Sequence, residues 1–178
     1  MAKFILRRVF NRVFHAIARV APGSTTLRPT LHRWRGAQIG RGVFIGDDVY
    51  IDNEYPECVE IQEGAQISLR TSIIAHTRGS GRVIIEKNAF VGPHCVLVCG
   101  AGKTLRIAAG AVVGAGSVIT RSVPPGLFVS PDPPKPIARA QVPLPVAKSM
   151  AEFWAGLIPL SRPLPSPPPA PESERPPA

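Results

Sequence analysis

The stretch IGRGVFIGDDVYID, residues 39–52, decides the fold, because it places an aliphatic residue at every sixth position. The same spacing continues to Pro125 in three further sets of three steps, and a short irregular insertion separates each set from the next. Neither the two-residue period of a half-buried strand nor the 3.6-residue period of a helix produces this pattern. A short fixed repeat indicates a solenoid in which every repeat forms the same structural unit.

Twelve aliphatic residues occur in phase along the repeat, and they form three columns if each set makes one turn of a triangular coil. No single turn can bury its own apolar side chains, so stacked turns must share one core. Small residues at the fifth position, and glycine at the second or fourth, suit tight corners. We therefore predict an all-β solenoid of about four coils. Its columns are Ile39, Ile61, Ile85 and Ile107; Ile45, Ile67, Val91 and Val113; and Ile51, Ile73, Leu97 and Ile119.

These residues resemble the hexapeptide-repeat family of left-handed parallel β-helix proteins. The ending VGAGSVITRSVPPG, residues 113–126, is similar to the last coil of its acyltransferase branch. That branch includes maltose, nodulation-factor, colanic-acid and serine acetyltransferases. The resemblance covers residues 31–139 and implies a left-handed parallel β-helix, acetyl-CoA as co-substrate with no bound metal, and a homotrimer with active sites between subunits. It also implies an acceptor hydroxyl or amine on a sugar or polysaccharide precursor, which is an analogy of fold alone.

His76 is the general base that the resemblance implies, since it follows the third strand of the second coil, where a glycine-containing loop begins. A histidine can take the proton of the acceptor as that group attacks the acetyl-CoA thioester. The alternative is an exposed loop histidine without a catalytic role. Asp52 and Asn53 resemble a polar residue that some relatives set opposite the histidine, although a solvated loop is the favoured interpretation for both. Backbone N–H groups of Gly92 or Gly114 are candidates to hold the thioester oxygen.

The resemblance also implies a coenzyme A site along the last coils, where basic residues meet the cofactor phosphates for electrostatic reasons. Lys135 and Arg139 match a Pro-Ala-Lys-X-Ile-X-Arg ending, whereas the segment SPDPP, residues 130–134, departs from the Gly-X-Pro-Ala loop of relatives. The predicted cofactor-binding residues are Phe90, Pro93, Ala115, Thr120, Arg121, Lys135 and Arg139.

Two other functions compete with acyl transfer. His76, His94 and Cys99 resemble the metal site of γ-class carbonic anhydrases, which share this coil, although cysteine stands where a histidine is expected. The ITRSVPPG ending favours the acyltransferases. The third interpretation is a non-catalytic β-helix scaffold whose Pro-rich tail binds a partner.

The net charge of +9 belongs mainly to the N-terminal segment, because nine basic residues precede the first acidic residue, Asp47. Apolar residues at positions 6, 9, 10, 13, 14, 17 and 20 predict an amphipathic helix over residues 3–20, with Arg8, Arg12 and Arg19 on its other face. Such a helix can lie in a membrane interface, or it can pack its apolar face on the open end of the coil. Aromatic residues are sparse and do not alternate with the basic ones, so no nucleic acid is expected as a partner.

Location and processing follow from three features of the chain. The cysteines Cys58, Cys95 and Cys99 form an odd, unpatterned set that favours a reducing compartment. Basic residues interrupt the N-terminal apolar run, which argues against a cleaved secretory signal, whereas a mitochondrial-type presequence has a similar composition. No stretch is long enough to span a bilayer. We expect a cytoplasmic protein whose N-terminal helix is the element suited to peripheral contact with the inner face of the membrane.

We predict three segments along the chain. Residues 1–30 form the amphipathic helix and a linker, residues 31–139 form the β-helix domain, and residues 140–178 form a short helix and a Pro-rich tail. The short helix is predicted over residues 147–158, with Phe153 and Trp154 on it. The tail beyond Pro159 is predicted to be disordered with polyproline character.

Overall fold

The computed structural model describes residues 2–132, 138–146 and 148–159. The chain divides into two compact units, Met1–Pro131 and Asp132–Ala178. The first unit contains the solenoid and the N-terminal helices. The boundaries expected after residues 30 and 139 remain predictions.

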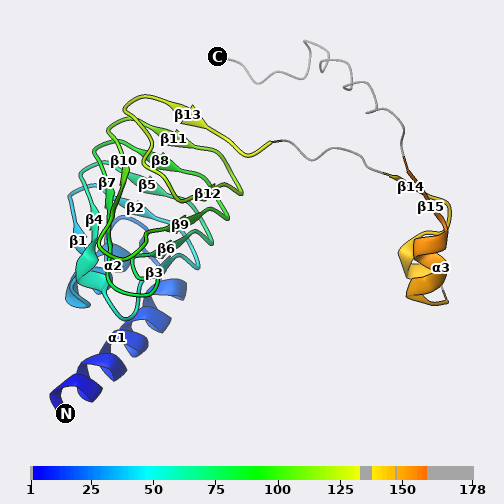
Figure 1. Ribbon diagram of the computed structural model, residues 1–178. Helices are drawn as coiled ribbons and strands as arrows, with labels where there is room; N and C mark the ends of the chain where they lie inside the picture. Colours follow the sequence, from blue (N-terminus) through cyan, green and yellow to red (C-terminus); the bar gives the residue numbers. More distant parts are fainter. Residues whose placement is uncertain (1, 133–137, 147, 160–178) are drawn as a thin grey trace. The chain divides into compact units, whose positions relative to one another are not determined.

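Short parallel strands stack into three columns, one for each side of a triangular coil (Figure 1). The first column contains β1 (Gln38–Ile39), β4 (Val59–Ile61), β7 (Arg82–Ile85) and β10 (Thr104–Ile107). The second contains β2 (Phe44–Ile45), β5 (Gln66–Ile67), β8 (Phe90–Val91), β11 (Val112–Val113) and β13 (Phe128–Val129). The third contains β3 (Tyr50–Ile51), β6 (Ser72–Ile74), β9 (Val96–Val98) and β12 (Val118–Ile119).

The register of these strands confirms the three predicted aliphatic columns. In the first column Ile39 pairs with Ile61, Ile61 with Ile85, and Ile85 with Ile107. The members of all three columns lie in one core and are fully buried, except for partly buried residues at the ends of the solenoid. The columns form most of the inner layer of the core, because each turn covers the apolar side chains of the next. Fifth-position residues such as Val43, Val49 and Ala65, and first-column residues such as Val83 and Leu105, are buried in the same cluster.

The corners of the coil use left-handed backbone at the fourth position of a repeat. Gly42, Gly64, Gly110 and Gly116 have positive φ angles there, and so do non-glycine residues such as His94, with φ of 57°. Glycine adopts this conformation without a steric cost, which explains its frequency at the fourth position. His94 thus occupies a structural corner of the third coil.

Glycine at the second position has a different cause, which is close approach between coils. A Cβ atom added to Gly46 would lie 2.6 Å from the backbone nitrogen of Leu69 in the next coil. We expect Gly46→Ala to destabilise the protein by about 1–3 kcal/mol, because backbone must move to admit the methyl group. The urea midpoint of unfolding measures this change.

Gly100→Ala is the matched control for that substitution. Its added Cβ would meet only the end of the Lys103 side chain, at 3.8 Å. The midpoint should therefore change little. Equal losses in the two variants would contradict the explanation by close approach of the coils.

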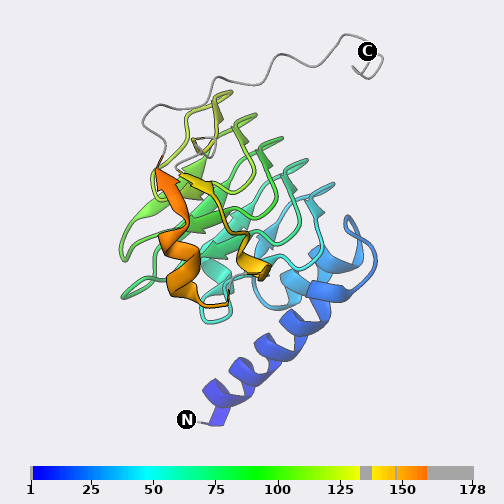
Figure 2. The same ribbon diagram turned by 90° about the vertical axis from the view of Figure 1, so that its right-hand side faces the viewer.

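Two helices lie at the end of the solenoid where the first coil begins (Figures 1 and 2). They are α1 (Ala2–Val20), which extends away from the coils toward the N-terminus, and α2 (Leu27–Trp34), which the repeat pattern did not predict. In α2, Leu31 and His32 are buried, and the buried Arg28 donates to the carbonyl oxygens of Ala21 and Ile45. These contacts join the helices to the first coil.

The N-terminal helix is amphipathic as predicted, but its apolar face does not pack on the coil. The buried residues of α1 are Asn11, His15 and Ala18, whereas Val9, Val13 and Ile17 are exposed. Of the two alternatives considered for this helix, packing of its apolar face on the open end of the coil is therefore not observed. Among the helices of the described residues, none is long and apolar enough to cross a membrane.

The second unit contains four short elements in its described part. They are β14 (Ala138–Ala140), η2 (Leu144–Val146), α3 (Met150–Ala155) and β15 (Leu157–Pro159). The predicted helix over residues 147–158 is thus shorter than expected, because Leu157 and Ile158 pair antiparallel with β14 instead. The Pro-rich tail, residues 160–178, lies outside the described residues, so the prediction of its disorder is not addressed by the structure.

Candidate active site

The loop that follows β6 carries His76 on a small hairpin at the side of the second coil. His76 forms an antiparallel bridge with Ser80, and the Gly81 N–H donates to the Ala75 carbonyl at 2.6 Å. The His76 side chain is 36% exposed. The backbone at His76 is therefore fixed by local contacts, and its side chain remains accessible to a substrate.

Asp52 lies beneath this ring and is fully buried. One of its carboxylate oxygens accepts from His76 Nδ1 at 2.5 Å and from the Ala75 N–H at 2.8 Å. The other accepts from the backbone N–H groups of Glu54 and Tyr55, at 3.0 and 3.1 Å. Four donors thus fix a buried carboxylate, which satisfies the need of such a group for hydrogen bonds.

The hydrogen bond between Asp52 and His76 selects one tautomer of the imidazole. An ionised carboxylate only accepts hydrogen bonds, so Nδ1 of His76 carries the proton and Nε2 of the neutral ring is free to accept one. The Tyr55 ring lies beside the imidazole, with 5.7 Å between the ring centroids. A partly exposed histidine whose ring is oriented by a carboxylate is the arrangement of a general base.

The expectation of a solvated loop at Asp52 and Asn53 is wrong. Asp52 is buried, and Asn53 is half-buried and accepts from Arg35 at 2.6 Å through its side-chain oxygen. The sequence offered one signal for Asp52, its position after the third strand of the first coil, one turn before the strand that leads to His76. Tyr55 had no such signal.

Buried Arg35 holds the loop that supplies Asp52. Its guanidinium also donates to the carbonyl oxygens of Ile51 and Asp52, each at 2.9 Å. Burial lowers the pKa of Arg35 to about 10, so the group keeps its charge at neutral pH. From α1, Asn11 donates to the Asn53 carbonyl at 3.4 Å. The N-terminal helices therefore support the loop beside the candidate base.

The predicted cofactor-binding residues of the first unit lie at two different corners of the coil. Pro93 and Ala115 occupy the corner that leads into the third column, where the Gly116 N–H donates to the Pro93 carbonyl at 2.9 Å. Phe90 lies on β8, immediately before that corner, and is partly exposed. Ala115 is exposed and Pro93 is half-buried, on consecutive coils.

Thr120 and Arg121 lie at the corner that leaves the third column, which is also the side of the coil that carries His76 two turns earlier. They line a shallow hollow of about 270 Å³ with Val118, Pro124 and Val129. Lys135 lies outside the described residues, and Arg139 lies in β14 of the second unit. A single solenoid therefore separates the candidate cofactor residues between the two edges of its third column.

The proposed oxyanion donors are not free. The Gly92 N–H donates to the Val113 carbonyl at 2.8 Å, and the Gly114 N–H donates to the Val129 carbonyl at 2.7 Å. Both groups belong to the ladder that joins successive coils, so the expectation that one of them holds the thioester oxygen is wrong.

The structure does not gather His76, His94 and Cys99 into a metal site. Within residues 2–132, 138–146 and 148–159, no group of three or more His, Cys, Asp or Glu side chains is placed to share an ion. His94 is exposed at its corner, and the buried Cys99 thiol lies 3.2 Å from the Lys103 carbonyl.

The three parallel columns and the six-residue period define a parallel β-helix of the hexapeptide-repeat class. A crystal structure of a hexapeptide-repeat acetyltransferase from Vibrio cholerae shares this fold, with a TM-score of 0.51 and 19% identity over 74% of this chain and 89% of the other. The resemblance inferred from the repeat is thereby confirmed for the fold.

Curated relatives match part of the sequence. The bifunctional protein GlmU of Paracidovorax citrulli is 35% identical in an alignment of 109 positions, and the match covers 51% of this chain and 21% of GlmU. The chain thus spans about a fifth of the length of that relative. The Bacillus subtilis protein named "Putative acetyltransferase YvoF" is 26% identical in an alignment of 133 positions, and the match covers 72% of this chain and 75% of YvoF. No protein-family model matches the chain.

Proposed function

We propose that this chain is an acyltransferase of the hexapeptide-repeat type, which moves an acetyl group from acetyl-CoA to a hydroxyl or amine of a sugar or polysaccharide precursor. The observation that carries the proposal is the buried Asp52 carboxylate at 2.5 Å from Nδ1 of an accessible His76. The shared fold of a hexapeptide-repeat acetyltransferase and the similarity to YvoF support the same reaction class.

The proposed chemistry assigns a separate part to each residue. His76 Nε2 takes the proton of the acceptor as its oxygen or nitrogen attacks the thioester carbonyl, and the C–S bond then breaks to release the thiol of coenzyme A. Asp52 orients the ring and stabilises the imidazolium while it holds the proton. Neither the fold nor this dyad identifies the acceptor. The choice of a sugar rests on the family resemblance alone.

A homotrimer is part of the proposal because the candidate residues lie at two edges of one column. Pro93 and Ala115 of one subunit would meet His76 of a neighbouring subunit if the site forms between solenoids. The phosphates of the co-substrate would meet Thr120 and Arg121, since an exposed guanidinium suits a phosphate group. Lys135 and Arg139 remain proposed phosphate ligands. Three free thiols fit the proposed cytoplasmic location.

Calorimetric titration of acetyl-CoA into the full chain tests this function. Saturable binding near one site per subunit is expected, followed by acceptor-dependent release of free thiol. A folded trimer that binds no acetyl-CoA would contradict the proposal, and bound zinc in the purified protein would favour the metal-site alternative instead.

Asp52→Asn should lower kcat by about 10²-fold or more, because an asparagine NH₂ group facing the ring favours the tautomer that carries its proton on Nε2. Steady-state kinetics, with an acceptor that supports the release of free thiol, measure this loss. Glu63→Gln is the control, since it removes a carboxylate that is exposed and distant in sequence from the dyad. Unchanged kcat in Asp52→Asn would contradict the orienting role.

A further inference from the structure

The exposed face of α1 forms an apolar ridge of six side chains. All are at least two-fifths exposed, and Leu6 and Val20 reach 73% and 79%. Scattered apolar residues on a surface need no explanation, but a continuous stripe along one helix indicates a site of contact. The ridge consists of Leu6, Val9, Phe10, Val13, Ile17 and Val20.

The opposite face of α1 is already committed to the first coil, so the ridge is not left exposed by a loosely placed helix. Asn11, His15 and Ala18 are buried there, and the Asp48 N–H donates to the Arg19 carbonyl at 2.9 Å. The coil therefore holds the helix by its more polar side and presents the apolar side outward.

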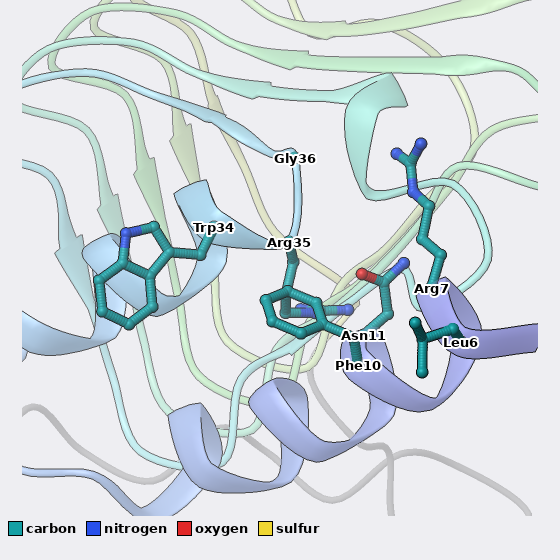
Figure 3. A pocket seen from close by; sticks show the side chains of 7 residues that line it. All are labelled: Leu6, Arg7, Phe10, Asn11, Trp34, Arg35 and Gly36. Carbon is teal, nitrogen blue, oxygen red and sulfur yellow. The ribbon is translucent and has the colours of Figure 1, made fainter. Parts of the chain in front are cut away.

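Aromatic residues extend the ridge onto α2. The Phe10 and Phe14 rings stack with centroids 4.1 Å apart, and Phe14 meets Trp34 edge to face at 5.7 Å. Leu6, Phe10 and Trp34 line one hollow of about 380 Å³ together with Arg7, Asn11 and Arg35 (Figure 3). Trp34 is 61% exposed, and tryptophan is favoured where apolar and polar surroundings meet.

Arginines border the ridge on both sides. At about 100° per residue, Arg12 lies about 60° beyond Val9 on one side of the ridge. Arg7 lies about 60° beyond Phe10 on the other side. The side chains of Arg7 and Arg12 are 61% and 72% exposed, although they approach Glu57 and Glu54 at 3.5 and 3.7 Å. Arginines at the edge of an apolar face can keep their charge at the level of lipid headgroups.

Charge favours one occupant over another. No acidic residue precedes Asp47, so the first 46 residues carry only positive side-chain charge apart from neutral histidines. A second copy of α1 would bring arginines together, whereas an anionic lipid surface would be attracted to them. The helix is not long and apolar enough to cross a bilayer. On a membrane, an amphipathic helix of this kind lies in the plane of the interface.

We propose that α1 binds the surface of a bilayer that contains anionic phospholipid, with its apolar ridge and Trp34 inserted among the headgroups and acyl chains. The arginines along its borders contact the lipid phosphates. The docked face of α1 stays on the solenoid, so binding needs no unfolding of the helix. This association is independent of acyl transfer.

Vesicle flotation with the full chain tests the proposal. The protein should float with vesicles of phosphatidylcholine mixed with phosphatidylglycerol, and less with phosphatidylcholine alone or at high salt. The double variant Val13→Glu/Ile17→Glu should lose about tenfold or more of the bound fraction, because two exposed anchors become acidic. Leu69→Glu, at an exposed apolar residue of the coil, should bind as the unchanged chain does.

Three outcomes would overturn the proposal. The unchanged chain could remain unbound by mixed vesicles, or Val13→Glu/Ile17→Glu could bind them equally well. The double variant could also change the oligomeric state in the absence of lipid, which would assign the ridge to a second copy. A blue shift of Trp34 fluorescence on vesicle addition, measured in a Trp154→Phe chain, would support insertion.

Discussion

His76→Ala is expected to lower kcat for acetyl transfer by about 10²–10⁴-fold, which is the contribution of a positioned general base. The ring provides the Nε2 atom that takes the proton of the acceptor, and alanine provides no acceptor of protons there. Affinity for acetyl-CoA should change little, because the proposed cofactor residues of the same chain lie at other positions of the coil. Steady-state kinetics and calorimetry on the same preparation separate the two effects.

The loss in His76→Ala should not come from unfolding. The ring is partly exposed, and the backbone contacts of its hairpin do not involve the side chain. The truncation leaves the Asp52 carboxylate with three backbone N–H donors, so the buried charge keeps most of its hydrogen bonds. A urea midpoint close to that of the unchanged protein is the required control.

His94→Ala distinguishes base catalysis from a metal mechanism. A general base at His76 alone predicts nearly unchanged kcat in this variant, whereas a zinc site with His94 as ligand predicts a loss as large as that of His76→Ala. Equal losses of kcat in the two variants would contradict the proposed acyltransferase mechanism. Full activity in His76→Ala would contradict the role of His76 as the general base.

Acid should destabilise the packing of the N-terminal helices well above the pH at which carboxylates titrate. Burial, together with the charge of Arg35, lowers the pKa of His15 to about 4 and the pKa of His32 to about 3. His32 Nδ1 lies 2.7 Å from the Arg35 guanidinium and must accept its hydrogen bond in the neutral form. Neither ring nitrogen of His15 has a hydrogen-bond partner among the described residues.

The sign of the effect follows from proton binding. Between pH 6.5 and the lowered pKa values, the unfolded chain binds more protons than the folded chain, so the free energy of unfolding decreases as the pH falls. At about 1.4 kcal/mol per pKa unit, each histidine accounts for about 2–3 kcal/mol between pH 7 and pH 4.5. Glu60 and Glu86 have pKa values lowered from 4.5, so their contribution appears below this window.

Urea unfolding at several pH values measures this dependence. His15→Leu should remove about 2–3 kcal/mol of the loss between pH 7 and pH 4.5, because the apolar side chain does not titrate. His94→Gln should keep the full acid dependence, since that histidine is exposed. The explanation fails if His15→Leu loses as much stability in acid as the unchanged protein.

The six-residue period was enough to predict the solenoid and its core. Each aliphatic residue of the three columns, from Ile39 to Ile119, points inward for a reason that is local to its own turn, namely the angle between successive short strands. Because the same pattern repeats along the chain, the period would remain recognisable even if one turn departed from it. The amphipathic character of α1 followed equally from spacing.

The candidate site needed the folded chain. Asp52 and His76 are 24 residues apart, and only the stacking of β3 on β6 brings the carboxylate under the ring. Burial of Asp52 also depends on Arg35, which donates to the Asp52 carbonyl, and on the loop that contains Asp52. Neither Arg35 nor this loop belongs to the six-residue repeat. From sequence alone, a short polar segment between two coils is interpreted as a solvated loop, because the residues that contact it in the fold are unknown.

The orientation of α1 shows the same division between local pattern and tertiary contact. Spacing of apolar residues specifies that the helix has two faces, and it says nothing of which face meets the coil. In the first coil, Asp48 accepts a hydrogen bond from Arg19 of the helix, and the Asn53 carbonyl accepts one from Asn11. The Tyr50 ring packs edge to face on the His15 ring. These contacts turn the apolar residues outward, because hydrogen bonds and ion pairs at the coil end are made by the polar face.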